Sequence, residues 1–123
     1  VAGTMMSDTY ENCQATMPKP MINIHGVNDP IVPYEGAPGL VPINDVLNFW
    51  SELNFAENVE INFFEGVENY VYKDSIETPF VSHYKILNGT HTWDYNSLLS
   101  NNINTNELIW EFVSKFDING FIE

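Results

Sequence analysis

The order of the predicted elements indicates an α/β fold. Short apolar segments typical of strands alternate with two segments whose apolar residues recur at helical spacing, and two neighbouring strand-like segments suggest a hairpin. The chain has 123 residues, of which 44% are hydrophobic, so one domain with a real core fits and two do not. We expect the order strand, loop, helix, hairpin, strand, loop, helix, which is typical of the α/β class.

The first predicted strand covers residues 21–25, a short apolar run that Gly26 closes. Residues 27–42 are rich in proline and glycine. Because proline has no backbone N–H to donate and disfavours helix in the residue before it, this stretch is predicted to be a loop. Residues 44–56 predict a helix that Asn44 caps. Its buried side is expected to hold Val46, Leu47, Trp50 and Leu53.

Residues 59–64 and 67–72 flank Glu65 and Gly66 and predict a small β-hairpin. The next strand is expected at residues 80–87, where alternate residues point to opposite faces. Tyr84 and Ile86 would share one face, with Val81 and His83 on the other.

A polar turn at residues 88–93 leads toward the closing helix. Asn104 is placed to cap this helix, and Glu107 follows three residues later, as in a capping box. Its buried face is expected to consist of Leu108, Ile109, Phe112, Val113 and Phe116.

The charge of the chain is strongly negative, because four basic residues stand against 17 acidic ones, a net charge of −13. Such a charge repels phosphate backbones and anionic lipid headgroups, so no nucleic-acid partner and no membrane partner are expected. The first residues lack the basic start and apolar stretch of a signal peptide. Cys13 is the only cysteine, which leaves a small buried thiol or a bridge to a segment outside this sequence.

Two loops carry a titratable side chain just beyond the end of a predicted strand. Asp29 follows the first strand, and His91 follows the strand at residues 80–87. Ligands of open α/β sheets bind at this end of the strands. An acid followed later in the sequence by a histidine matches the last two members of the Ser, Asp, His order of α/β-hydrolases. There the histidine takes the proton of a serine, and the carboxylate fixes the tautomer of the histidine.

The surroundings of both residues resemble a known family. Ile24-His-Gly-Val-Asn-Asp-Pro-Ile-Val-Pro-Tyr34 is similar to the segment around the catalytic acid of the polyhydroxybutyrate depolymerase and feruloyl esterase family. Leu87-Asn-Gly-Thr-His-Thr-Trp93 resembles the segment around the catalytic histidine of that family. The resemblance runs over nearly the whole chain. It implies the C-terminal part of an α/β-hydrolase fold, with short parallel strands, two amphipathic helices and a small hairpin, in one partial domain over residues 1–123.

The same resemblance implies part of a secreted, extracellular serine esterase that hydrolyses polyhydroxyalkanoates or feruloyl and acetyl cell-wall esters. Asp29 and His91 would be the acid and base, Trp93 would line the substrate pocket, and no metal or organic cofactor is implied. No serine lies in a Gly-x-Ser-x-Gly motif, so the nucleophile is expected upstream of Val1 and the isolated chain is expected to be inactive. A sheet cut in this way exposes an edge, which we expect to pair with the missing N-terminal half or a second copy.

The chain departs from the family pattern near His91. Asn88, Gly89 and Thr90 stand where the family usually has paired glycines, and Asp94 replaces a proline, which would reshape the rim of the site. The asparagine run at residues 101–107 offers oxygen ligands for calcium, but it lacks the mid-loop glycine of an EF-hand and fits helix capping better.

Simpler roles remain open for the residues of the site. Asp29 could serve only an Asn-Asp-Pro turn, His91 could be an ordinary loop residue, and Trp93 could be a packing residue. A zinc site would need His25, His83 and His91 together, and these lack a close-spaced ligand pair, so His83 is expected to be structural and His25 to shape the loop of Asp29.

Two other functional classes remain open. A non-catalytic carbohydrate- or polymer-binding module would use Trp50, Trp93 and Trp110 as stacking surfaces, although helical spacing favours the core for Trp50 and Trp110. The third possibility is a relative of the esterases that has lost its serine and keeps only the scaffold.

Overall fold

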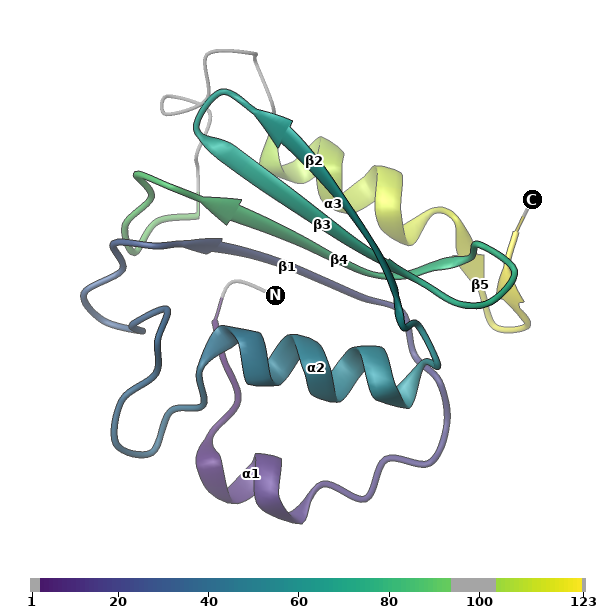
Figure 1. Cartoon of the computed structure of the whole chain (residues 1–123), viewed down its shortest axis with the longest axis horizontal. Helices are drawn as coiled ribbons and strands as arrows, with labels where there is room; N and C mark the ends of the chain where they lie inside the picture. The colour runs from purple at the N-terminus through teal and green to yellow at the C-terminus, as the bar shows by residue number, and fades with distance from the viewer. Residues whose placement is uncertain (1–2, 94–103, 123) are drawn as a thin grey trace.

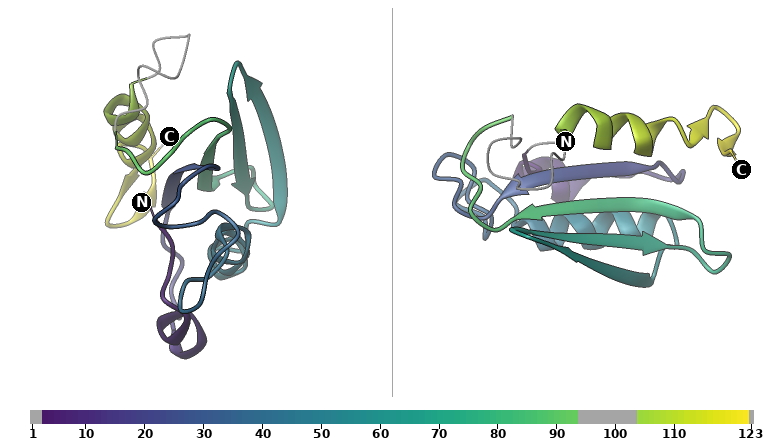
Figure 2. Two further views of the ribbon diagram at one scale, coloured as in Figure 1. Left: turned by 90° about the vertical axis from the view of Figure 1, so that its left-hand side faces the viewer. Right: turned by 90° about the horizontal axis from the view of Figure 1, so that it is seen from above.

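The structure is a computed structural model that describes residues 3–93 and 104–122. A four-stranded sheet in the order β1-β4-β3-β2 forms its middle layer (Figure 1). The strands are β1 (Met21–Gly26), β2 (Asn58–Phe64), β3 (Val67–Lys73) and β4 (Pro79–Ile86). Helix α2 (Ile43–Leu53) covers one face of the sheet and α3 (Thr105–Val113) covers the other (Figure 2). The short helix α1 (Ser7–Asn12) and a two-stranded sheet of β5 (Phe116–Asp117) and β6 (Gly120–Phe121) complete the described chain.

The predicted fold class, the C-terminal part of an α/β-hydrolase fold with parallel strands, is wrong. Of the three neighbouring pairs in the four-stranded sheet, only β1 with β4 is parallel, whereas β3 pairs antiparallel with both β2 and β4. The sheet is therefore mixed and mostly antiparallel. The reason lies in the connections, because parallel neighbours need a crossover of a dozen or more residues. The hairpin and the short link at residues 74–78 can join only antiparallel strands, and only the long path from β1 to β4 allows a parallel pair.

The strands themselves were predicted correctly. The segment at residues 21–25 forms β1, whose residues are all buried, and the segment at residues 80–87 forms β4. The predicted hairpin is β2 and β3, paired without interruption from Asn58 with Lys73 to Phe64 with Val67. Its turn uses Gly66 at a φ of 78°, a conformation that glycine adopts without strain.

The two helices confirm one of the two predicted caps. The Asn104 side chain accepts hydrogen bonds from the backbone N–H groups of Asn106 and Glu107, so this residue caps α3 as expected. Helix α2 instead begins at Ile43 after Pro42, which leaves Asn44 inside the first turn, so the prediction that Asn44 is the cap is wrong. Proline before the first turn suits a helix start because the missing N–H would have no intrahelical acceptor there.

Two hydrophobic cores fill the spaces on either side of the sheet. The α3 side holds Ile22, Ile24, Val67, Ile86 and Phe112, with Tyr84, Leu108, Ile109 and Phe116 packed against them. The α2 side holds Met21, Tyr34, Ile43, Leu47 and Val81, with Trp50 packed against them. Alternate residues of β1 and β4 thus serve opposite cores, as their period of two requires.

Four details differ from the sequence-based expectations or extend them. Trp110 is 70% exposed rather than in the core, and Val113 is also exposed. Phe116 lies in β5, beyond the end of α3. Cys13 is exposed, so the interpretation as a buried thiol is wrong. No described helix is both long and apolar enough to cross a lipid bilayer.

Candidate functional site

Two loops meet at the C-terminal ends of β1 and β4. Because these strands are parallel neighbours, the segments that follow them leave the sheet at the same end. Two backbone hydrogen bonds, each 2.9 Å long, connect the loop after β1 to the end of β4 and its loop. They run from Val27 N–H to the carbonyl of Ile86 and from Asn28 N–H to the carbonyl of Gly89. The sheet thus brings together residues that are far apart in the sequence.

The approach of the two loops depends on a pair of glycines. A β-carbon on Gly89 would lie 2.8 Å from the α-carbon of Gly26, and a β-carbon on Gly26 would collide with the carbonyl group of Gly89. Neither position has room for a side chain, because the obstacles at Gly26 are backbone atoms of Gly89 and Thr90, and those at Gly89 are the α-carbon of Gly26 and the base of the Ile86 side chain. Gly89 lies two residues before His91, and this contact requires that it carry no side chain.

Asp29 and His91, the two predicted catalytic residues, face each other across this contact. The Nδ1 atom of His91 lies 2.9 Å from Oδ2 and 3.1 Å from Oδ1 of Asp29. The Asp29 side chain is only 4% exposed, while that of His91 is 49% exposed. One end of the imidazole is therefore fixed by a buried carboxylate, and the ring remains accessible from outside.

Asp29 also organises its own turn. Its Oδ1 atom accepts hydrogen bonds from the backbone N–H groups of Ile31 (2.9 Å) and Val32 (2.8 Å). On the sequence alone the turn role and the acid role of Asp29 are alternatives, and the geometry accommodates both. The two N–H groups hold the carboxylate in place, and Oδ2 is left to face the imidazole of His91.

These contacts set the charge of Asp29. Burial favours the neutral form of Asp29, but hydrogen bonds from the Val32 N–H, the His91 ring and the Ile31 N–H outweigh it and lower the pKa of the carboxyl. Asp29 is therefore ionised at neutral pH. An ionised carboxylate can only accept a hydrogen bond, so Nδ1 of a neutral His91 ring must carry the hydrogen. Nε2 is then left as the acceptor.

His25 contacts the loop that carries Asp29. Its Nε2 atom lies 2.9 Å from the carbonyl oxygen of Val32 and 3.6 Å from Oδ2 of Asp29, and the residue is 2% exposed. An N–H group at Nε2 of His25 can donate a hydrogen bond to the Val32 carbonyl. Its partial positive charge then also lies near the Asp29 carboxylate. This arrangement agrees with the expected role of His25 in shaping the acid loop.

His83 is a buried structural residue, as predicted. It lies in β4 with no exposed surface, and its Nε2 atom is 2.8 Å from the hydroxyl of Tyr34. Burial lowers the pKa of His83 to about 3, although an interaction with the backbone of Asn23 opposes the shift. The ring is thus neutral, and a hydrogen bond joins its Nε2 atom to the Tyr34 hydroxyl, with the direction set by the tautomer of the ring. Among residues 3–93 and 104–122, no cluster of three or more histidine, cysteine or acidic side chains is placed to hold a metal ion.

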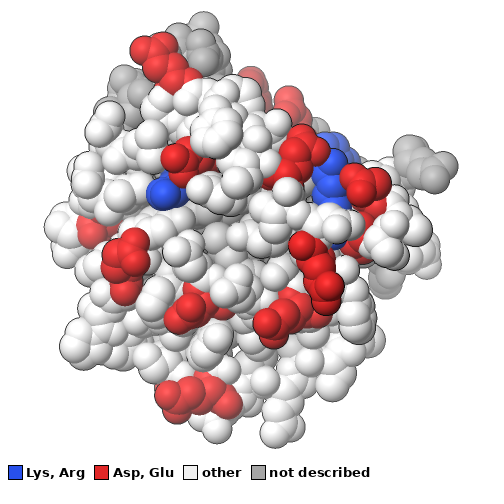
Figure 3. All heavy atoms as spheres, in the orientation of Figure 1, with Lys and Arg blue, Asp and Glu red and all other residues white. Residues whose placement is uncertain are grey.

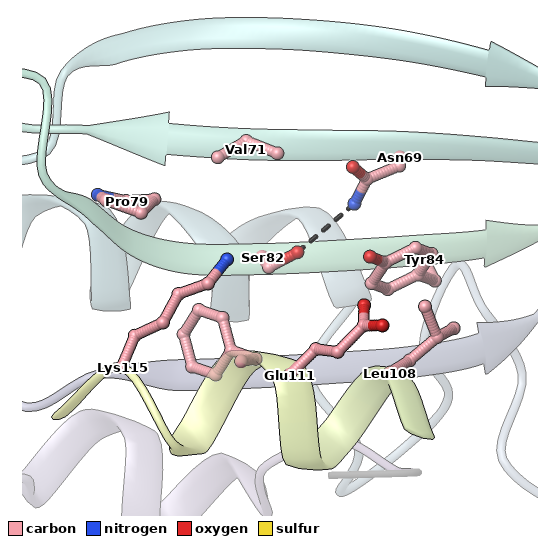
Figure 4. Close-up of a pocket in the computed structure, with 9 residues that line it drawn as sticks. Asn69, Val71, Pro79, Ser82, Tyr84, Leu108, Glu111 and Lys115 are labelled. Carbon is pink, nitrogen blue, oxygen red and sulfur yellow. Dashed lines mark hydrogen bonds between the residues drawn. The ribbon is translucent and has the colours of Figure 1, made fainter. Parts of the chain in front are cut away.

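Trp93, the predicted substrate-binding residue, lies two positions after His91 and is 53% exposed. Its indole N–H points to the side chain of Asn106 in α3 at 3.4 Å. A hollow of about 170 Å³ lies elsewhere, between α3 and the sheet, where Glu111 and Lys115 reach toward β4 (Figure 4). Neither Trp93 nor the Asp29–His91 pair lines this hollow, so it is not part of the candidate site.

No serine of the described chain is hydrogen-bonded to His91, whose ring contacts Asp29. Ser51 and Ser82 are buried and bonded elsewhere, to the Asn48 carbonyl and the Asn69 side chain. Ser97, Ser100 and Asp94 lie outside the described residues, as does the first part of the asparagine run at residues 101–107. Acidic side chains are spread over the face shown in Figure 3, with lysines beside a few of them.

Comparison with known proteins gives no family model and no curated sequence that matches the chain. The pairing of Asp29 with His91 was predicted from the sequence, because each residue follows a strand. The Gly26–Gly89 contact and the Tyr34–His83 bond were missed. A single glycine after a strand is a weak signal, and no local pattern relates a tyrosine in a loop to a histidine in a distant strand.

Proposed function

We propose that Asp29 and His91 are the acid and base of a serine esterase that hydrolyses carboxylic esters, with the nucleophilic serine in a segment upstream of Val1. The observation that carries this proposal is the 2.9 Å contact between Nδ1 of His91 and Oδ2 of the buried Asp29. A surface ion pair would have two exposed partners, whereas here the carboxylate is buried and immobilised. This combination is what orienting a general base requires.

The roles of the two residues follow from their protonation. Nε2 of His91 takes the proton of the serine hydroxyl while the serine oxygen attacks the ester carbonyl. The ring then holds two protons, and the adjacent carboxylate of Asp29 stabilises its positive charge. His91 next gives this proton to the leaving alcohol, which leaves an acyl-enzyme. A water molecule repeats the sequence, losing its proton to Nε2 and releasing the acid, and the serine regains its proton.

The substrate class proposed is a polyester or a plant cell-wall ester, and the protein is proposed to act outside the cell. Support comes from the resemblance of the two loop segments to those of polyhydroxybutyrate depolymerases and feruloyl esterases. Trp93 is proposed to contact the substrate, because its exposed ring lies two residues from His91 and could cover an aromatic or acyl group. The 123-residue chain alone is expected to be inactive.

The test uses the complete product of the gene, assayed on p-nitrophenyl acetate, methyl ferulate and a 3-hydroxybutyrate oligomer. His91→Gln should abolish hydrolysis, and Asp29→Asn should lower kcat by about 10⁴-fold because the wrong tautomer is held. Asn88→Ala changes an exposed residue of the same loop and should leave the rate unchanged. Undiminished hydrolysis by His91→Gln, or no hydrolysis of any ester by the parent protein, would overturn the proposal.

A second candidate is a non-catalytic module that binds carbohydrate or polymer. The observation in its favour is that Trp93 and Trp110 are both exposed, and that Asn106, which Trp93 contacts, lies one helical turn before Trp110. Binding to insoluble polyester or cellulose would then fall with Trp110→Ala and be unaffected by His91→Gln. Loss of hydrolysis in His91→Gln with unchanged polymer binding supports the esterase over this module.

A further inference from the structure

Strand β2 is an edge of the sheet that lies open on both faces. Every residue of β2 except Asn62 is exposed. On the α2 side of the sheet, its residues Val59, Ile61 and Phe63 are 49%, 43% and 74% exposed. Helix α2 packs mainly against β4, two strands away from β2, and the exposure of these three side chains shows that it leaves the row uncovered. A row of three large apolar side chains is therefore left unpartnered at the rim of the sheet.

The outer edge of β2 also lacks the features that normally prevent pairing. Edge strands are usually protected by short length, proline, bulges or charged side chains, above all lysine. Strand β2 contains no proline, and it pairs with β3 in one continuous register. Its single charged residue, Glu60, is bound to the ammonium group of Lys73. No strand of the described chain pairs with this edge.

The sequence of β2 is complementary to itself in the antiparallel direction. If two copies are related by a two-fold axis at Ile61, Ile61 faces its own copy and Val59 faces Phe63 of the second copy. On the other face, Glu60 lies opposite Asn62 of the second copy, so that a carboxylate faces an amide donor and no like charges stand directly opposite each other within the strand. Just beyond the strand, Glu57 comes opposite Glu65 of the second copy. An isologous interface needs this kind of self-complementarity.

We propose that β2 is a dimerisation edge, which pairs antiparallel with β2 of a second copy about Ile61 and joins the two sheets into one. The pairing satisfies the outward backbone groups of both strands and places the two apolar rows side by side, which removes part of their surface from water. This inference is independent of the proposed esterase activity. It also places the second copy at β2, the edge opposite β1. Because each chain carries a net charge of −13, added salt should strengthen the dimer by screening the repulsion.

The first experiment is sedimentation velocity on the 123-residue chain over a range of concentrations and at two salt concentrations. The parent chain should form dimers, and Ile61→Lys should weaken association by more than about tenfold, since two like charges would meet at the axis. Ile76→Lys is the matched control, because Ile76 is 79% exposed in the link between β3 and β4. A parent chain that stays monomeric at every concentration, or a dimer that Ile61→Lys leaves intact, would overturn the proposal.

The second experiment tests the register directly. Opposite residues of an antiparallel pair have α-carbons about 4.5–5.5 Å apart, which is within the range for a disulfide. With the exposed Cys13 changed to serine, Ile61→Cys should form an intermolecular disulfide under mild oxidation, and Ile76→Cys should not. Equal cross-linking at both positions would indicate random collision and would count against the register.

Discussion

Gly26 and Gly89 touch backbone to backbone, and this contact sets the distance between the loops that carry Asp29 and His91. A β-carbon on either residue would overlap main-chain atoms of the other. The loops could then no longer approach as they do, and the hydrogen bond from Asn28 N–H to the Gly89 carbonyl would be disturbed with them. The geometry of the candidate site therefore rests on two residues that have no side chain.

Gly89→Ala is expected to lower the free energy of unfolding by about 1–3 kcal/mol, the usual result of forcing extra atoms into a packed region. Chemical denaturation measures this change. Gly3→Ala is the control, because a β-carbon there meets nothing within 4 Å and should leave stability nearly unchanged. Equal stability of the Gly89→Ala variant and the parent would show that the two loops can move apart freely.

His91→Ala is expected to raise the pKa of Asp29. Burial already favours the neutral carboxyl, and the Val32 and Ile31 N–H groups would remain to oppose it, but the hydrogen bond and charge of His91 would be gone. Carbon-13 NMR of the aspartate carboxyl resonances follows this titration directly. Thr92→Ala, a change in the neighbouring exposed residue, should leave the Asp29 titration where it is. An unshifted titration in His91→Ala would mean that the two side chains do not interact in solution.

The stability of the protein should fall as the pH drops below about 6.5 because of His83. The folded-state pKa of His83 is about 3, below the ordinary value of 6.5, so between these values the unfolded chain binds a proton that the folded chain does not. The free energy of unfolding should thus decrease by up to ~1.4 kcal/mol per pH unit from this group. Denaturant titrations of the parent and of His83→Gln between pH 7 and pH 4.5 test this, and parallel curves would contradict it.

Asp29 affects the stability of the protein in a more acidic pH range than His83. Its pKa is lowered from 3.8 in the folded protein, so its contribution to stability is present above that value and is lost only as the pH falls further. A loss of stability near pH 5.5 therefore reports on histidine rather than on this carboxylate.

Asn104→Ala is expected to destabilise the protein by about 1 kcal/mol, because the side chain accepts two hydrogen bonds from the first turn of α3. Asn44→Ala removes the same group from a position inside the first turn of α2, where no capping bond exists, and should have little effect. Thermal or chemical unfolding of the two variants gives the comparison. Similar losses from both substitutions would mean that the caps were assigned incorrectly.

The sequence predicted local structure better than it predicted topology. The hairpin around Gly66 and the strands β1 and β4 follow from apolar runs and turn residues that lie next to one another. Which strands become neighbours depends on how the hairpin joins the sheet, and the hydrophobic periodicity of the sequence contains no information about strand order. The parallel sheet was inferred from the resemblance, and the antiparallel pairing of β3 with β4 contradicts it.

The same distinction applies to single residues. Asp29 and His91 were found because each ends a strand, whereas the exposure of Trp110 was missed because it lies beside an apolar stripe without belonging to it. Helix α1 and the pair β5 and β6 are too short to show a period, and they were not predicted. Short elements of this kind are fixed by contacts with the rest of the protein.

The parallel pairing of β1 with β4 also determines when the candidate site can form during folding. Strands β2, β3 and β4 close only short loops, so they can assemble early, whereas β1 must join β4 across the whole intervening helix and hairpin. Asp29 can reach His91 only after this closure, which spans the longest stretch of chain between paired strands of the four-stranded sheet. A chain that has not completed its sheet therefore has no oriented imidazole, and the Asp29–His91 contact is a signature of the fully folded state.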